Sequence, residues 1–167
     1  MNDLEIYPRS PTPFILENRL NLLPECPIEP RSILIIILHS RFPLDGEGES
    51  IDREKDRCLQ RYLAIAESFR LANDRAGFGA EIISPKNGFP LYSARGKIAF
   101  DTVAIVHQTL GFDFDRTPAG CKVLKHPSQG SSVYPGLFLS SAESSIVPAL
   151  FRETLPESKG LLENILR

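Results

Sequence analysis

The stretch that decides the fold is "SILIIILHS", residues 32 to 40, in which six aliphatic side chains follow one another without a polar residue. This run is far shorter than the roughly 20 residues that span a bilayer, so it predicts a buried β-strand and no membrane helix. An unbroken aliphatic strand has no polar face, which is typical of a central strand covered on both sides. The first strand is therefore expected from Ser32 to Ser40.

Length and composition are those of one globular domain. The chain has 167 residues, of which 42% are hydrophobic and 24% charged, and its formal net charge is -2. It has no basic stripe that would bind nucleic acid. The N-terminus lacks an apolar signal segment, and three irregularly spaced cysteines fit a reducing compartment. We therefore expect a cytoplasmic protein whose partners include neither nucleic acid nor a membrane.

Prolines and apolar spacing divide the first half of the chain. Six prolines within residues 1–30 argue against continuous helix or sheet, so this segment is interpreted as an N-terminal arm with one short docking helix. Residues 31–167 are then expected to form a single domain. Apolar residues recur at helical spacing from Ile51 to Ala76, with Ser50 as the expected N-cap and Gly77 as the stop.

The second half alternates strand and turn signals. The predicted elements are a strand at Ala80 to Ser84, strands at Cys121 to His126 and Ser131 to Ala142, and one or two helices from Glu143 to Arg167 that are interrupted at Pro148 and Pro156. The segment from Phe100 to Phe112 carries two signals: its β-branched residues favour a strand, whereas Asp101 as cap and Gly111 as stop favour a short helix, which we expect. The "PSQG" turn predicts that the last two strands form a hairpin, and Pro135 predicts an edge or a bulge. The fold class is α+β, with a mixed, mainly antiparallel sheet and flanking helices.

The segment "GCKVLKH", residues 120 to 126, carries the candidate site. In a strand, Cys121 and Lys125 share one face, whereas Lys122 and His126 lie on the other. A cation close to a thiol favours the thiolate, which is the nucleophile and the metal ligand. A partly buried structural cysteine is the more frequent role of a single cysteine and stays open as the alternative. The spacing of Cys58 is that of a core residue.

A Cys–His pair between Cys121 and His126 is excluded by distance. Five residues of extended strand separate the two side chains by about 16 Å, which is too far for a hydrogen bond. His39 or His107 would have to act as the base instead, and nothing in the sequence brings either residue close. We interpret His126 as a strand-end residue that is hydrogen-bonded to the following turn.

Four blocks of sequence, in this order, resemble the C-terminal domain of the CblD (MMADHC) family of cobalamin-trafficking proteins: "GFGAEIISPKNG", "LGFDFD", "GCKVLKH" and "GSSVYPGLFLSSA". The resemblance extends, with gaps, from about Pro13 to Ala142. It implies a fold similar to flavin nitroreductases but without a functional flavin site, so no flavin is expected. It also implies an adapter, not an enzyme, that meets a CblC-like cobalamin-processing protein.

The resemblance assigns a thiolate ligand of cobalt to Cys121, with Gly120, Lys122, Lys125 and His126 as its setting. Thiolates are soft ligands and a corrin leaves an axial position of cobalt open, so no second protein ligand is required. A flavin-dependent reductase, a thiol-dependent transferase using Cys121 and a structural interaction domain stay open as alternatives. Nitroreductase-like domains often dimerise, so a homodimer is an expectation by analogy.

Overall fold

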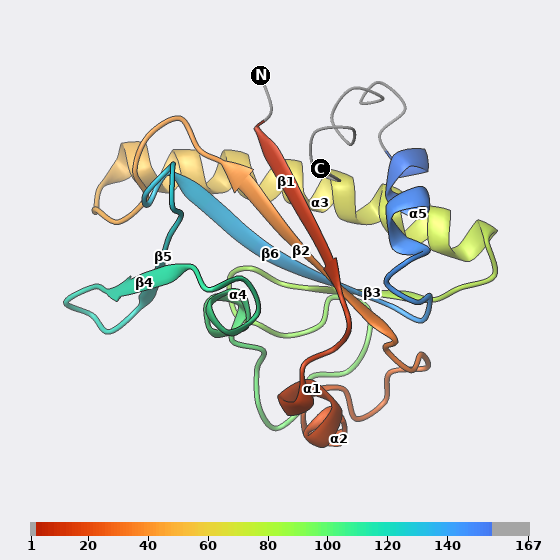
Figure 1. Ribbon diagram of the computed structural model, residues 1–167. Coiled ribbons are helices and arrows are strands. Elements are labelled where there is room, and N and C mark those ends of the chain that lie inside the picture. Colours follow the sequence, from red (N-terminus) through yellow and green to blue (C-terminus); the bar gives the residue numbers. More distant parts are fainter. Residues whose placement is uncertain (1–2, 155–167) are drawn as a thin grey trace.

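The computed structural model describes residues 3–154 and arranges them around one four-stranded antiparallel sheet (Figure 1). The strands of this sheet lie in the order β1 (Leu4–Arg9), β2 (Ser32–His39), β6 (Val133–Ser140) and β3 (Ala80–Ile83). Strands β4 (Asp113–Arg116) and β5 (Lys122–Lys125) form a separate hairpin. The helices are α1 (Pro13–Glu17), α2 (Arg19–Leu22), α3 (Glu49–Arg75), α4 (Thr102–Leu110) and α5 (Val147–Thr154). The predicted α+β class is confirmed.

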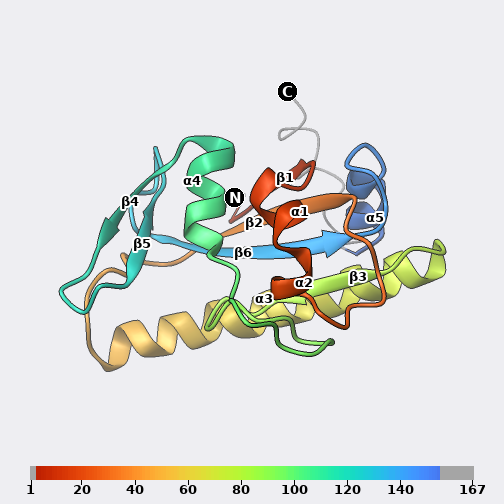
Figure 2. The same cartoon turned by 90° about the horizontal axis from the view of Figure 1, so that it is seen from below.

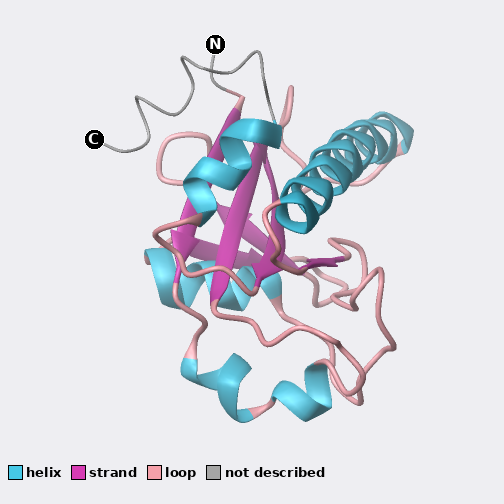
Figure 3. Cartoon of the chain, turned by 90° about the vertical axis from the view of Figure 1, so that its right-hand side faces the viewer, coloured by secondary structure: helices cyan, strands magenta, loops and turns pink. Residues whose placement is uncertain are grey.

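Strand β2 separates two hydrophobic cores, as its unbroken aliphatic sequence predicts. Leu34, Ile36 and Leu38 belong to the core that includes residues of α3 and α5. Alternate residues 33, 35 and 37 belong to the other core, with side chains of α1, α2 and α4. Figures 2 and 3 show α3 and α4 on opposite sides of the sheet.

Helices α3 and α4 confirm the two helices predicted in these regions. The buried side chains of α3 include Cys58, which was predicted to be a core residue. The start of α3 differs slightly, because the helix begins at Glu49 after Gly48, so Ser50 is not its N-cap. Asp101 caps α4 by accepting a hydrogen bond from the backbone N–H of Ala104 at 2.9 Å. These helices are predictable because spacing and capping residues are local signals.

Strand β1 corrects the expectation that the prolines argue against continuous sheet in the first 30 residues. The N–H of His39 donates to the carbonyl of Asp3 at 2.8 Å, and the register pairs Leu4 with Leu38. Alternate residues of an antiparallel strand bond to the same neighbour, so Pro8 falls at a position that faces away from β2. Its missing N–H therefore breaks no bond of the ladder. The division of the chain at residue 30 stays a prediction.

The predicted hairpin between residues 121–126 and 131–142 is wrong, because β5 pairs with β4. The "PSQG" turn does form, and two backbone hydrogen bonds of 2.8 and 2.9 Å join His126 and Gly130 across it. Beyond this bridge the two segments separate. Strand β6 pairs with β2 along residues 133–140 and with β3 at residues 137–140, whereas β5 pairs along its whole length with β4.

Pro135 lies in a central strand, yet its position is locally an edge. Strand β3 pairs only with residues 137–140 of β6, so residue 135 lies beyond the end of β3. Beside it, the hydroxyl of Tyr62 on α3 accepts the N–H of Leu137 at 3.2 Å and donates to the carbonyl of Ile83 at 2.7 Å. Gly136 makes room for this ring, since an added Cβ would lie 2.0 Å from Cε2 of Tyr62.

Helix α5 starts at Val147, with Pro148 in its first turn. Proline is tolerated there because the N–H that it lacks would have no partner within the helix. The prediction that Pro148 interrupts a helix is therefore wrong. The predicted interruption at Pro156 lies outside the described residues. Within residues 3–154, the helices are too short or too polar to cross a bilayer.

Candidate functional site

Cys121 lies exposed at the tip of the β4–β5 hairpin, which projects from one end of the molecule (Figure 1). The N–H of Gly120 donates to the carbonyl of Thr117 at 2.8 Å, and the N–H of Thr117 donates to the carbonyl of Cys121 at 2.9 Å. Gly120 has a φ of 86°, the left-handed conformation that follows the turn in three-residue hairpin loops. The "TPAG" segment is therefore the turn that presents the thiol.

The two lysines of the predicted site are engaged with carboxylates. Lys122 forms an ion pair with Asp101 and lies 5.5 Å from the ring centre of Phe114. Lys125 forms an ion pair with Asp115 at 2.7 Å. Burial raises the pKa of Asp101, but the hydrogen bond from Lys122 helps to outweigh it, and the pKa lies below its ordinary value. The lysines therefore stabilise the hairpin and its contact with α4, and their charges are paired with carboxylates and not with the thiol.

Apolar and aromatic contacts also join the hairpin to α4. Leu124 is buried in the same core as Ile105 and Val106 of α4. His107 of α4 bonds through Nδ1 to the carbonyl of Phe112 at 2.7 Å, which places the imidazole proton on Nδ1. His107 is thus held at the start of β4, where it supports the hairpin.

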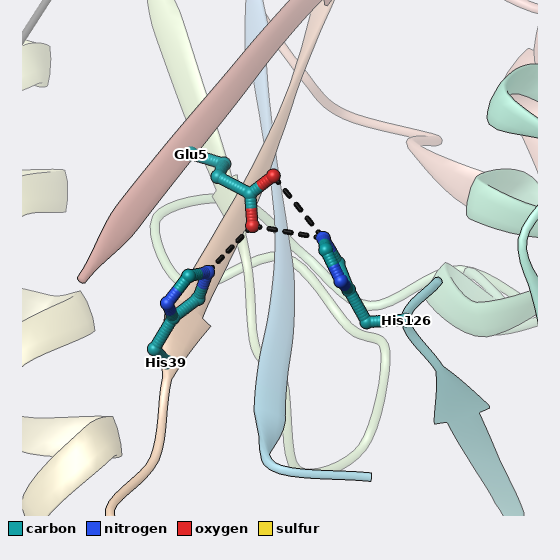
Figure 4. A group of neighbouring side chains, drawn as sticks. All are labelled: Glu5, His39 and His126. Carbon is teal, nitrogen blue, oxygen red and sulfur yellow. Dashed lines mark hydrogen bonds and ion pairs between the residues drawn. The ribbon is translucent and has the colours of Figure 1, made fainter. Parts of the chain in front are cut away.

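A second group of polar side chains lies at the base of the hairpin (Figure 4). The carboxylate of Glu5, on β1, lies between the imidazoles of His39, which ends β2, and His126, which follows β5. Glu5 Oε2 is 2.6 Å from Nε2 of His39 and 3.0 Å from Nε2 of His126. The hydroxyl of Tyr7 donates to Glu5 Oε1 at 2.7 Å. We call these four residues the carboxylate–histidine cluster.

The cluster stabilises an ionised Glu5. Its side chain is only 20% exposed, and among the described residues it has no ion pair with lysine or arginine. Burial raises the pKa of Glu5, but hydrogen bonds from Tyr7, His39 and His126 outweigh this effect and hold the pKa below its ordinary value. Burial and the neighbouring carboxylate raise the pKa of Tyr7, so its hydroxyl stays a donor.

The hydrogen bonds of His126 decide whether this cluster suits a metal ion. The three ligand atoms of Glu5, His39 and His126 lie within 4.8 Å of one another. However, Nδ1 of His126 accepts the N–H groups of Ser128 and Gln129 at 3.1 and 3.2 Å, so the proton lies on Nε2 and points to Glu5. A metal-bound imidazole needs an acceptor at its other nitrogen, and here that nitrogen faces donors. The donor set fits a hydrogen-bonded carboxylate, not a metal ion.

The structure places the predicted site residues in two locations. Gly120, Cys121, Lys122 and Lys125 lie in the hairpin, whereas His126 lies at its base and belongs to the cluster. The interpretation of His126 as a strand-end residue bonded to the following turn is confirmed. Cys121 has neither His107 nor His126 as a partner, since both imidazoles are bound elsewhere.

Sequence reasoning missed Glu5 and His39 as members of a site. Glu5 is 34 positions from His39 and 121 positions from His126, and no local spacing connects them. One signal was present: Leu4 and Ile6 alternate with polar neighbours, which is typical of a strand with one polar face. That alternation would have predicted β1, although not its contact with His126.

Together, fold and site define an α+β protein that presents one cysteine on a projecting hairpin. The family model described as methylmalonic aciduria and homocystinuria type D protein matches residues 3–150. The chain therefore belongs to this family, which confirms the resemblance carried by the four sequence blocks. Membership implies a role in cobalamin metabolism, in a family of trafficking proteins rather than catalysts. A search of curated proteins found no match.

Proposed function

We propose that the protein is a cobalamin-trafficking adapter that donates the thiolate of Cys121 to cobalt while it is docked on a CblC-like cobalamin-processing protein. The observation that carries this proposal is the exposed position of Cys121 at a hairpin tip, in a member of this family. A corrin is a flat macrocycle whose cobalt is reached along its axis. A ligand that projects from its own protein surface meets this requirement.

One protein sulfur is sufficient for this role. The corrin ring itself supplies the equatorial nitrogen ligands, and a thiolate is a soft donor suited to an axial position. Catalysis by Cys121 would require a base within hydrogen-bond reach. The imidazoles of His107 and His126 are engaged with Phe112 and Glu5, so the local chemistry favours ligation over catalysis.

The remaining residues of the candidate site act through the hairpin. Gly120 permits the left-handed turn that ends at Cys121. Lys122 ties the hairpin to Asp101 at the start of α4, and Lys125 pairs with Asp115 across the two strands. His126 fixes the end of β5 through its bond to Glu5. In this proposal they position the sulfur, and Cys121 alone meets the metal.

Visible spectroscopy of cobalamin tests the proposal. Wild-type protein added to reduced cobalamin on a CblC-like protein is expected to shift the cobalt absorption bands, because a thiolate enters the axial position. The Cys121→Ser variant removes the sulfur with little change of shape and is expected to abolish the shift. Cys26→Ser, at a half-buried thiol outside the hairpin, is the matched control and is expected to retain it.

Two results would overturn the proposal: no shift with the wild-type protein, or an equal shift with Cys121→Ser. The alternatives have their own signatures. A purified protein that is yellow and retains a flavin supports the reductase. Loss of a turnover reaction on selective alkylation of Cys121 supports the thiol-dependent transferase.

A further inference from the structure

The β4–β5 hairpin depends on anchors outside itself. An isolated two-stranded hairpin is marginally stable in water, and each of these strands has four residues. On one side the hairpin is held by α4, through Lys122 and the buried Leu124. The other anchor is at its base, where His126 follows β5 and belongs to the carboxylate–histidine cluster.

The base determines where Cys121 lies. Cys121 and His126 are five residues apart along an extended strand, which corresponds to about 16 Å. A rotation of roughly 10° at the base would displace the tip by about 3 Å over that length. This displacement exceeds a typical metal–sulfur bond of about 2.3 Å. A cysteine that must reach a metal atom therefore needs a fixed base.

Glu5 fixes the base of the hairpin through His126, whose two nitrogens bond to different parts of the chain. Its carboxylate accepts Nε2–H of the imidazole, whose Nδ1 accepts the backbone N–H groups of Ser128 and Gln129. The side chain of His126 is only 8% exposed, so little water competes for these bonds. One imidazole thus connects β1 to the turn that follows β5.

The other strand of the hairpin meets β1 at the same place. The ring of Phe112, directly before β4, lies 5.0 Å from the ring of His126 and 6.2 Å from the ring of Tyr7, edge-on in both cases. Tyr7 in turn donates its hydroxyl to Glu5. Both ends of the hairpin base are therefore held against the polar face of β1.

We propose that Glu5 is a positioning residue for Cys121: its carboxylate holds His126 and thereby sets the direction in which the hairpin presents the thiol. The purpose of this arrangement rests on the proposed function, but its test does not, because the position of Cys121 is measurable without cobalamin. His39 shares the carboxylate from β2 and lies edge-on to the ring of His126, with 5.9 Å between the ring centres, but among the described residues it forms no hydrogen bond to the hairpin. Its removal is expected to leave the hairpin in place.

Spin-label distance measurement tests the proposal. One nitroxide is attached to Cys121 and a second to Gln60→Cys on the exposed face of α3, in a background with Cys26→Ser and Cys58→Ala. Wild-type Glu5 is expected to give a narrow distance distribution. Glu5→Gln removes the charge that holds both histidines, and its distribution is expected to be at least twice as wide.

A second variant separates the bond to Glu5 from the turn itself. In His126→Asn the amide oxygen replaces Nδ1 and still accepts the turn N–H groups, but the side chain no longer reaches Glu5. This variant is expected to broaden the distribution as Glu5→Gln does. His39→Asn and Glu17→Gln, an exposed residue of α1, are the matched controls and are expected to keep the narrow distribution.

Unchanged widths in both Glu5→Gln and His126→Asn overturn the proposal, even if their melting temperatures fall, because that result describes a stabilising role without positioning. If Glu5→Gln does not fold, the width in His126→Asn decides. A broadened distribution with no cobalt shift in the wild type would overturn the proposed function and leave the positioning role standing. A cobalt shift in the wild type, together with unchanged distance distributions in both variants, would support the proposed function and overturn the positioning role of Glu5.

Discussion

At the scale of single residues, Tyr62 replaces a backbone group where strand β3 ends. Its hydroxyl bonds to the N–H of Leu137 and the carbonyl of Ile83, and its side chain is fully buried. Burial raises the pKa of Tyr62, so the hydroxyl remains a donor. The ring lies against Gly136, where any side chain would collide with it. Helix α3 is thereby joined to the interior of the sheet by a polar contact as well as by apolar packing.

Removing this hydroxyl is expected to destabilise the fold. Tyr62→Phe leaves the buried groups of Ile83 and Leu137 without this partner, which is expected to lower the free energy of unfolding by about 1–3 kcal/mol. Urea denaturation measures the change. Tyr134→Phe is the control, because that hydroxyl has no hydrogen bond among the described residues and its loss is expected to change stability by less than about 0.5 kcal/mol. Equal losses in the two variants would contradict the assignment.

At the scale of elements, β5 shows the limit of turn signals. It is flanked by "TPAG" and "PSQG", and both segments form turns. Sequence predicted the turns but assigned β5 to the wrong partner, because turn signals flank β5 on both sides and do not determine whether it pairs with the strand before it or the strand after it. Strand β1 shows the same limit, since Pro8 is compatible with a strand only at a position facing away from the neighbour. Spacing and caps, in contrast, predicted α3 and α4 because those signals are local.

The hairpin turn is expected to be sensitive to substitution of Gly120. An added Cβ would meet no atom within 4 Å, so the penalty of Gly120→Ala comes from the left-handed backbone alone, at about 1–2 kcal/mol. Amide hydrogen exchange in β4 and β5 is expected to accelerate by roughly 5- to 30-fold. Amides of β2 and β6 are the internal control and are expected to exchange at the wild-type rate.

The Gly120→Asn variant tests the same cost of the left-handed backbone with a smaller expected penalty. Asparagine adopts the left-handed conformation more readily than alanine, so the acceleration in β4 and β5 is expected to be smaller. Exchange at the wild-type rate in both variants would show that Gly120 does not control the turn.

At the scale of the whole molecule, the carboxylate–histidine cluster could not be predicted from sequence. Its members come from β1, the end of β2 and the turn after β5, and only the completed fold brings them together. The family resemblance predicted that Cys121 is the candidate ligand residue. Its exposure was not, because exposure follows from the pairing of β4 with β5.

Acid is expected to destabilise the whole fold, in part through Glu5. The pKa of Glu5 is lower in the folded protein than its ordinary value of 4.5, so the unfolded chain binds a proton more readily. The stability that Glu5 contributes is therefore complete above about pH 5 and is lost as the pH falls through the lower, folded-state pKa. Asp3, Glu54, Glu67 and Asp101 shift in the same direction.

Denaturation at several pH values measures this contribution. The free energy of unfolding of the wild type is expected to fall below about pH 5, and that of Glu5→Gln to fall less steeply, so the two curves converge in acid. Glu17→Gln serves as the control and is expected to follow the slope of the wild type. Parallel curves for Glu5→Gln and the wild type would show that the fold does not depend on the charge of Glu5.

The position of Pro8 also affects how copies of this chain meet. The backbone hydrogen-bonding groups that point away from β2 are those of Leu4, Ile6 and Pro8. Leu4 and Ile6 each have an N–H, whereas Pro8 has none. A strand from another molecule laid along this edge would meet Leu4 and Ile6, which are each only 2% exposed, and then Pro8, which has no N–H to donate. Prolines on edge strands hinder the extension of a sheet from one molecule to the next. Pro8, one of the prolines that argued against a strand in the sequence, thus hinders the extension of the sheet along the outer edge of β1.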